Sequence, residues 1–122
     1  MRGIRGATTV ETNTKEAIWQ RAQEMLTVMM KENAIIPADI EAAIFSATED
    51  LTAAFPTAGV RQLDGFDAVP LFDARQSAVE GSLPLCVRVL LFVDTDRPKN
   101  EIRHIYLHGA KVLRPDLAKS CV

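Results

Sequence analysis

The stretch LCVRVLLFVD, residues 85–94, has the pattern of a central β-strand and carries a positive charge at its middle. Side chains alternate between the two faces of a strand, so one face is entirely aliphatic and the other holds Arg88. A guanidinium stays charged in proteins, and burying it without a partner is costly. The sequence therefore predicts that an anionic group meets Arg88. The aliphatic face consists of Leu85, Val87, Val89, Leu91 and Val93, and the other face of Cys86, Arg88, Leu90 and Phe92.

The bulk composition bounds the size and the class of the protein. A chain of 122 residues that is 48% hydrophobic and 25% charged is long enough for one domain, residues 1–122, with a real core. The net charge of −2 argues against a nucleic-acid-binding or acidic-membrane-binding surface. Because nine arginines stand against five lysines, the composition leans towards planar recognition of a small anionic ligand.

Cysteine use and apolar runs predict a cytoplasmic, soluble protein. Cys86 lies in the apolar strand and Cys121 next to the C-terminus, so neither a zinc motif nor a disulfide framework is formed. The start, MRGIRGATTV, lacks the apolar core of a signal peptide, and the longest apolar run, VLLFV, is too short to cross a bilayer.

The remaining pattern predicts an α+β domain: a mixed sheet of four to five strands with one long helix and short helical turns. The helix should run from about Thr14 to Asn33, with Asn13 and Glu16 as a capping box and an apolar stripe on one face. One helix covers only one face of the sheet, so the face with Arg88 needs a subunit partner or a ligand. Strands are expected at 1–10, 41–48, 68–74 and 85–94, and a last strand or pair of strands at 102–113.

The usual tools of enzyme chemistry are missing from the sequence. His104 and His108 are four residues apart, but they fall in an expected strand and turn with no third ligand, so metal binding is not expected. The glycines of GIRGA have the wrong spacing for a phosphate loop, and no Ser or Cys has the signature of an activated nucleophile. No cofactor is expected either.

A set of arginines remains as the candidate site. Arg5, Arg61, Arg88 and Arg114, together with Tyr106, could form a pocket for a small dianion, acting by positioning and electrostatics without a nucleophile. Each arginine also has an ordinary structural interpretation. Arg61 and Arg114 could be solvated surface charges, Arg5 could lie at a strand edge, and Arg88 could pair with a buried carboxylate such as Asp73 or Glu80.

Five segments carry a specific family resemblance, in order and at the right intervals. They resemble the monofunctional chorismate mutases of the trimeric class, whose fold is a pseudo-α/β barrel and not an all-helical bundle. The resemblance covers nearly the whole chain. The segments are RGIRGATTVE at 2–11, SATEDLTAAFP at 46–56, VPLFDARQ at 69–76, EGSLPLCVRVL at 80–90 and RHIYLHGAKVLRPDL at 103–117.

The resemblance implies an isomerase that converts chorismate to prephenate by a unimolecular Claisen rearrangement, without cofactor or covalent intermediate. It also implies a homotrimer with active sites between adjacent subunits. Such a site must hold the enolpyruvyl ether in a compact chair and place positive charge where the breaking C–O bond leaves negative charge. By resemblance, Arg88 of CVRV is the catalytic residue beside the ether oxygen.

The resemblance also implies roles for the other site residues, all in substrate binding. Arg5 should hold a substrate carboxylate and Tyr106 should hydrogen-bond to it, while Phe55 shapes the apolar wall. Arg61 should attract the second carboxylate, and Leu113 and Arg114 belong to a tail segment that closes over the ligand. Phe55, Arg61, Leu113 and Arg114 are expected from a neighbouring chain, and the tail from about residue 115 is expected to be mobile.

One departure from the family pattern affects the expected contact with the ring hydroxyl. Many relatives have a cysteine and, three residues later, a glutamate, where this chain has Asp73 and Gln76. Side chains three apart on an ideal strand point to opposite faces, so a bulge or a strand end at Ala74–Arg75 is needed for both to face the substrate. Ala58 replaces a basic residue of some relatives, which leaves the pocket mouth less positive.

Two other classes of function stay open at this point. The chain could be a catalytically silent trimeric domain that binds an anion or regulates, for which the missing glutamate is the only favourable feature. It could also be another trimer with interface pockets, such as an enamine or imine hydrolase, although that group's motifs are not seen.

Overall fold

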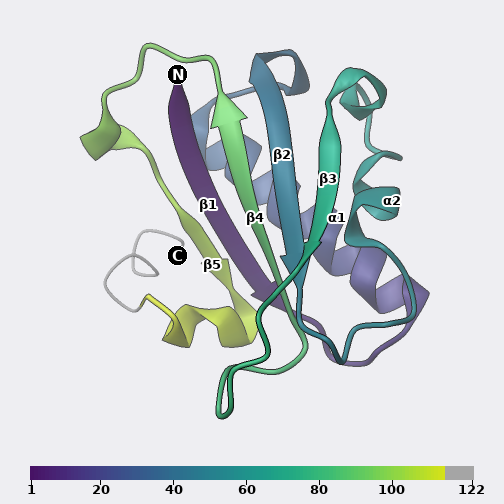
Figure 1. Cartoon of the computed structure of the whole chain (residues 1–122). Helices are drawn as coiled ribbons and strands as arrows, with labels where there is room; N and C mark the ends of the chain where they lie inside the picture. Colours follow the sequence, from purple (N-terminus) through teal and green to yellow (C-terminus); the bar gives the residue numbers. More distant parts are fainter. Residues whose placement is uncertain (115–122) are drawn as a thin grey trace.

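A computed structural model describes residues 1–114 of the chain, and Cys121 and the expected mobile tail lie outside the described residues. Within this part, five strands form one mixed sheet, and a single long helix lies behind it (Figure 1). The expected α+β fold is therefore confirmed. The strands are β1 (Arg2–Thr9), β2 (Ile40–Ala47), β3 (Leu71–Arg75), β4 (Cys86–Val93) and β5 (Ile105–Leu107). The α-helices are α1 (Lys15–Asn33) and α2 (Pro56–Val60), and short 3-10 helices are formed by Pro37–Asp39 (η1), Phe66–Ala68 (η2), Lys99–Glu101 (η3) and His108–Val112 (η4).

The sheet order, β3-β2-β4-β1-β5, places β4 at the centre. β4 is antiparallel to both of its neighbours, β1 and β2, while the outer pairs β1–β5 and β2–β3 are parallel. β1 and β2 lie on either side of β4 and run in the same direction, and strands that run in the same direction need a crossover connection. The chain supplies α1 between β1 and β2, and the shorter α2 between β2 and β3. Both α-helices thus lie on the same side, and the opposite face of the sheet is turned towards the viewer in Figure 1.

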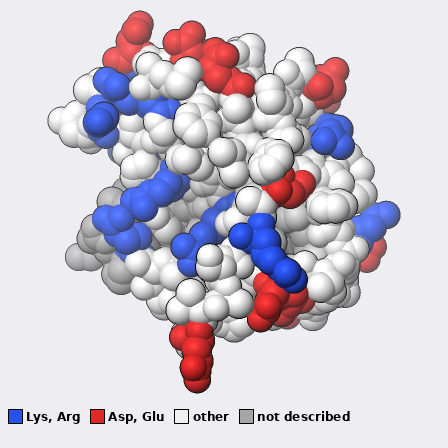
Figure 2. Space-filling model, viewed as in Figure 1, with Lys and Arg blue, Asp and Glu red and all other residues white. Residues whose placement is uncertain are grey.

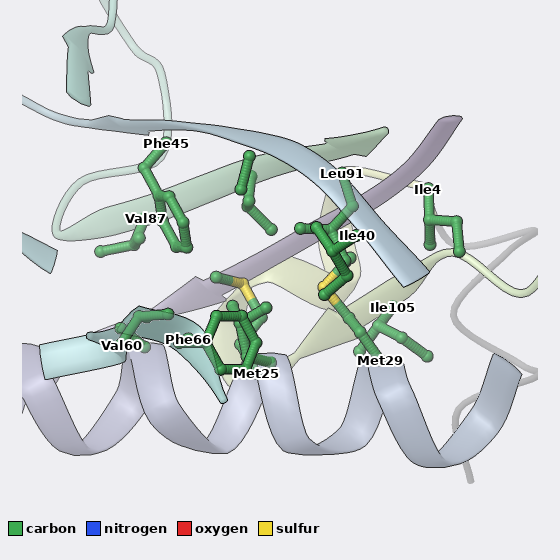
Figure 3. Close-up of a cluster of buried hydrophobic side chains, with 14 of the residues drawn as sticks. Ile4, Met25, Met29, Ile40, Phe45, Val60, Phe66, Val87, Leu91 and Ile105 are labelled. Carbon is green, nitrogen blue, oxygen red and sulfur yellow. The ribbon is translucent and has the colours of Figure 1, made fainter. Parts of the chain in front are cut away.

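The core lies between α1 and the aliphatic face of β4, as Figure 3 shows. Val87, Leu91 and Val93 are completely buried, and Val89 nearly so, which confirms the alternation predicted for this strand. The helix contributes the expected stripe, of which Met30 alone is only partly buried. Buried stripe residues of α1 are Ile18, Ala22, Met25, Leu26 and Met29.

The start of α1 differs from the prediction by one residue. Thr14, not Asn13, is the N-cap, and its hydroxyl accepts a hydrogen bond from the Ala17 amide. The Asn13 carboxamide instead accepts from the amides of Thr52 and Ala53, at 3.0 Å each. Asn and Thr are both favoured as helix N-cap residues. Thr14 has this role here because Asn13 is bound to the distant loop at residues 52–53.

The last expected strand is also shorter than predicted. Only Ile105–Leu107 pair with β1, and His108–Val112 form a 3-10 helix. His108 adopts a positive φ of 52°, which ends the extended conformation, and the buried Ala110 turns back onto the sheet. The expectation of strand structure up to residue 113 was therefore wrong.

None of the helices formed by residues 1–114 combines the length and the apolar character needed to cross a bilayer.

Gly59 provides a test of how closely α2 packs on α1. A Cβ at this position would lie 2.7–2.9 Å from three Trp19 atoms, including the backbone Cα. We expect Gly59→Ala to lower the free energy of unfolding by about 1–3 kcal/mol, because the two helices must separate. Denaturant unfolding measures this loss.

Gly3→Ala is the matched control, because the same added methyl group would meet only Leu90 Cδ1 at 3.5 Å. Equal stability changes in the two variants would contradict the close helix contact.

Candidate active site

The face of the sheet that α1 leaves open carries Arg88 at its centre. Arg88 on β4 is aligned with Ala7 on β1 and Ser46 on β2, and Ala7 is in turn aligned with Tyr106 on β5. Residues aligned across a sheet point to the same side. The small side chains of Ala7 and Ser46 therefore leave room on either side of the guanidinium.

A cavity of about 400 Å³ lies on this face and collects most of the predicted arginines. Figure 2 shows Lys and Arg side chains gathered about a hollow in the left half of this face. Leu113 and Arg114 line the same cavity as Arg88 within one chain, whereas the family resemblance implied that a neighbouring chain supplies them. Predicted site residues in this cavity are Arg5, Arg88, Tyr106, Leu113 and Arg114.

Arg88 has no carboxylate partner among residues 1–114. No ion pair joins it to Asp73 or Glu80, and its Nε is buried without a hydrogen-bond partner. Its guanidinium lies against the thiol of Cys86 on the same strand face. Burial raises the pKa of the Cys86 thiol, and the nearby Arg88 only partly opposes this, so the thiol stays neutral.

Asp73 lies on the other face of the sheet. It is aligned with Phe45, which is aligned with Val89, and both of these residues are buried on the helix side. The Thr57 hydroxyl of α2 donates a hydrogen bond to Asp73 Oδ2. An Asp73–Arg88 pair, one of the alternatives left open by the sequence, is therefore not formed within the chain.

A second cavity, of about 570 Å³, brings Asp73 together with Phe55 at the end of the sheet. Phe55 precedes α2 and is 67% exposed, and its carbonyl accepts a hydrogen bond from Trp19 Nε1. Arg61, at the other end of α2, is exposed and lines neither this cavity nor that of Arg88.

Gln76 follows directly after β3. The strand pairs with β2 without a bulge and ends at Arg75, so of the two expected solutions the strand end is the one observed. The Gln76 amide donates to Ala47 O at 3.1 Å, while its side-chain Oε1 is buried and accepts no hydrogen bond. Gln76 is among the residues that line a third cavity, of about 270 Å³.

Three buried side-chain polar atoms within residues 1–114 have no hydrogen-bond partner: Asp73 Oδ1, Gln76 Oε1 and Arg88 Nε. A buried polar atom without a partner costs on the order of 1–3 kcal/mol, so such atoms are rare and call for an explanation. All three belong to residues that the sequence assigns to the site. Unmet hydrogen-bonding capacity therefore coincides with the predicted binding groups.

Comparison with known proteins decides the family. A model of the family "Chorismate mutase type I" matches residues 1–117. The chain belongs to the type I chorismate mutases. Chorismate mutase AroH of Bacillus subtilis is 46% identical over 97% of the chain and 93% of its own length, and that of Thermus thermophilus is 50% identical over 96% of both. A chorismate mutase structure from Clostridium thermocellum superposes with a TM-score of 0.89 at 42% identity, covering 92% of this chain and 99% of that one. The family expected from the sequence is confirmed.

His104, which was not expected to bind a metal, has a structural role in this chorismate mutase. Its Nδ1 accepts a hydrogen bond from the backbone N–H of Arg5 at 2.9 Å, just before β5 begins. Burial and the cations of Arg5 and Arg114 lower the pKa of His104, which keeps it neutral and able to accept. Within residues 1–114 no cluster of three metal-ligating side chains is formed.

His104 should therefore make stability depend on pH. Because its folded-state pKa lies below the ordinary value of 6.5, the unfolded chain takes up the proton first as pH falls. We expect the contribution to be complete above pH 6.5 and to be lost as pH drops below it. Urea unfolding at pH 7.5 and 5.5 measures the loss.

His104→Asn is the matched variant, since its amide oxygen can accept from Arg5 but does not titrate in this range. An equal loss of stability in the wild type and in His104→Asn would refute this origin of the pH dependence.

Proposed function

We propose that this chorismate mutase rearranges chorismate to prephenate in aromatic amino acid biosynthesis, acting in the cytoplasm as one domain spanning residues 1–122. The observation that carries the proposed site is the coincidence of the three unpartnered buried polar atoms with predicted substrate contacts. In this isomerisation the ether C–O bond breaks as a new C–C bond forms, and no proton is transferred. The protein must therefore supply shape and charge, which is what the arginine-lined cavity offers.

The cavity around Arg88 suits the enolpyruvyl side of the substrate. Arg88, between two small neighbours, would present its guanidinium to the ether oxygen as negative charge develops there. Arg5 and Tyr106 would hold a carboxylate from β1 and β5, and Leu113 and Arg114 would close the cavity from η4. Cationic and phenolic donors at fixed strand positions cost little reorganisation during the reaction.

The second cavity suits the ring side of the substrate. Phe55 would press its exposed ring on the substrate, and the Asp73 carboxylate would accept a hydrogen bond from the ring hydroxyl. Gln76 offers a further acceptor through Oε1, and the exposed Arg61 would draw in the second carboxylate.

One chain cannot present both cavities to one substrate, because Arg88 and Asp73 point to opposite faces of the sheet. A second copy of the chain would bring its Phe55 and Asp73 against the first copy's Arg88. The open face also exposes apolar side chains that such a contact would cover, with Phe72 65% and Ile44 40% exposed. We therefore propose a closed homotrimer with three interface sites, in which each chain contributes both halves to different neighbours.

Replacing Arg88 by citrulline, its uncharged isostere, tests the catalytic role. We expect kcat to fall by about 10³-fold or more, because the positive charge at the ether oxygen stabilises the transition state. Chorismate consumption followed in the ultraviolet, with prephenate identified as product, measures the rate. Arg103→Gln is the control, since Arg103 is an exposed arginine outside the cavity that pairs with Glu32.

Near-normal turnover in the citrulline variant would reject the assignment of Arg88. A wild-type chain that binds chorismate without converting it would instead favour the catalytically silent alternative.

Mixing two inactive variants tests whether sites are shared between chains. Arg88→Ala removes one half, and Phe55→Asp places a repelling carboxylate in the other at an exposed position. After random subunit exchange in a trimer, roughly a quarter of the interfaces should combine two intact halves, and activity should recover to that level. A mixture no more active than its two components would contradict the shared site.

A further inference from the structure

The 3-10 helix η4 (His108–Val112) delivers Leu113 and Arg114 directly into the cavity of Arg88. The Leu113 amide donates to Ala110 O at 3.0 Å, so the path of these two residues is set by the helix before them. Contacts that hold the first residues of η4 therefore also determine the position of Arg114. Two contacts made by His108 and Gly109 do so.

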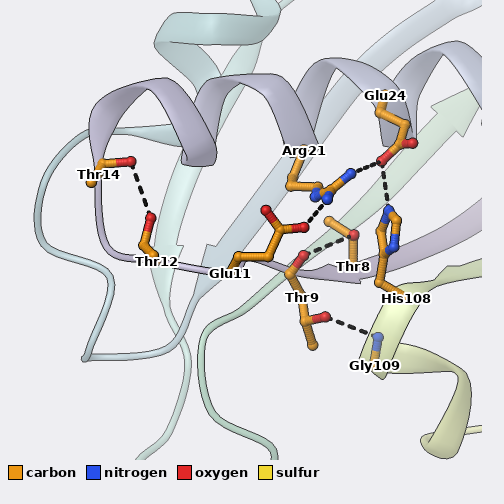
Figure 4. A network of polar contacts seen from close by, with 9 residues as sticks. All are labelled: Thr8, Thr9, Glu11, Thr12, Thr14, Arg21, Glu24, His108 and Gly109. Carbon is orange, nitrogen blue, oxygen red and sulfur yellow. Dashed lines mark hydrogen bonds and ion pairs between the residues drawn. The ribbon is translucent and has the colours of Figure 1, made fainter.

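His108 links η4 to the long helix. Its Nε2 lies 2.9 Å from Glu24 Oε1 on α1, and Figure 4 shows the imidazole ring pointing at this carboxylate. In this position the His108 backbone has a φ of 52°, a conformation that non-glycine residues rarely adopt and that is unfavourable. A side chain held in an unfavourable backbone conformation needs surrounding contacts that keep it there.

Glu24 is itself held in place from the side of α1. Arg21 Nη1 donates to the same Oε1 at 3.0 Å, and the other terminal nitrogen of Arg21 pairs with Glu11 (Figure 4). Burial raises the pKa of the Glu24 carboxyl, but the hydrogen bonds and charges of His108 and Arg21 outweigh this and lower it overall. The carboxylate that meets His108 is therefore ionised, and Arg21 holds it from the side of α1.

Gly109 provides the second contact. Its amide donates to Thr9 Oγ1 at the end of β1 at 2.9 Å, and an added Cβ would lie 3.0 Å from two Thr9 side-chain atoms. The chain thus approaches β1 closely at the residue next to His108. The two adjacent contacts clamp the start of η4 between α1 and β1.

We propose that Glu24 and His108 are positioning residues for substrate binding: their contact holds η4 so that Arg114 stays directed into the cavity. The proposal rests on the proposed function, in which Leu113 and Arg114 close the cavity over the substrate. Without the contact, η4 spends part of its time displaced, and only the fraction of molecules with Arg114 in place binds substrate well.

This role predicts a particular kinetic signature. Arg114 would cover the substrate in much the same way in the bound complex and in the transition state, so losing its placement weakens the binding of both to the same extent. KM should rise while kcat stays close to that of the wild type. Because the pair is partly exposed, with both side chains about 40% accessible, we expect a modest rise of roughly two- to fivefold.

The test compares Glu24→Gln, His108→Asn and the double variant. Asparagine tolerates a positive φ, so His108→Asn removes the imidazole contact with Glu24 while preserving the backbone conformation. Each single variant should raise KM, and the double variant should add little to either, because both remove the same contact. Lys111→Ala is the matched control, since it removes an exposed positive charge from η4 without touching Glu24.

Amide hydrogen exchange of residues 108–114 gives a readout that needs no substrate. Exchange in this segment should accelerate in Glu24→Gln and in His108→Asn, with the rest of the chain and the denaturant midpoint little changed. An unchanged exchange rate and KM in both variants would overturn the proposal. A KM rise shared by Lys111→Ala would also overturn it, by showing a general charge effect. Faster exchange in a protein whose wild type does not convert chorismate would uphold the contact and reject the proposed function.

Discussion

The alternation of side chains along β4 is the constraint on which the rest of the structure depends. Each buried aliphatic residue of this central strand faces α1, and the residues between them must then face away from the helix. Arg88 falls in the second set, so the fold that completes the core also places a charge at the middle of the open face. A shift of one residue in register would bury the charge against the helix and expose the core. The core and the site are therefore fixed by one choice of register.

The same alternation of side chains divides the predicted site residues of one chain between the two faces of its sheet. β3 and β4 are joined through β2, and the aligned positions carry Asp73 to the side of Phe45 and Arg88 to the side of Ser46. No change of side-chain rotamer can bring these two groups together through a five-stranded sheet. An active site that uses both must therefore be assembled from two chains, and this follows from strand geometry before any assembly is considered.

The sequence predicted well what depends on regular periodicity. The strand alternation at 85–94 and the helical stripe from Ile18 to Met29 each repeat over many residues, so the core face and the element type are both determined locally. Recognition of the motifs supplied the site residues, which periodicity alone does not distinguish from surface arginines. Their distribution over two faces was not foreseen, because it requires the pairing of strands far apart in the chain.

The errors arose where a local preference competes with a distant contact. Asn13 and Thr14 are both suitable helix N-cap residues. The Asn13 side chain is not available for this role, because it accepts hydrogen bonds from the loop amides of Thr52 and Ala53. A strand was expected to continue after Leu107, yet His108 adopts a positive φ and meets Glu24 from a different part of the chain. Neither partner can be identified from the local sequence, so only the tertiary structure decides between the alternatives.

Arg88 has no anionic side chain beside it among residues 1–114, and this leaves its charge available for a ligand. Cys86 is the titratable group beside it, and a thiolate there would neutralise the guanidinium. Burial prevents this, because it raises the pKa of the thiol by more than Arg88 lowers it. Asp73 lies on the other face, where it accepts a hydrogen bond from Thr57, and no carboxylate within residues 1–114 forms an ion pair with Arg88. Within residues 1–114 the half-buried Arg88 guanidinium thus has no carboxylate to balance it, and a dianionic ligand could supply the missing negative charge.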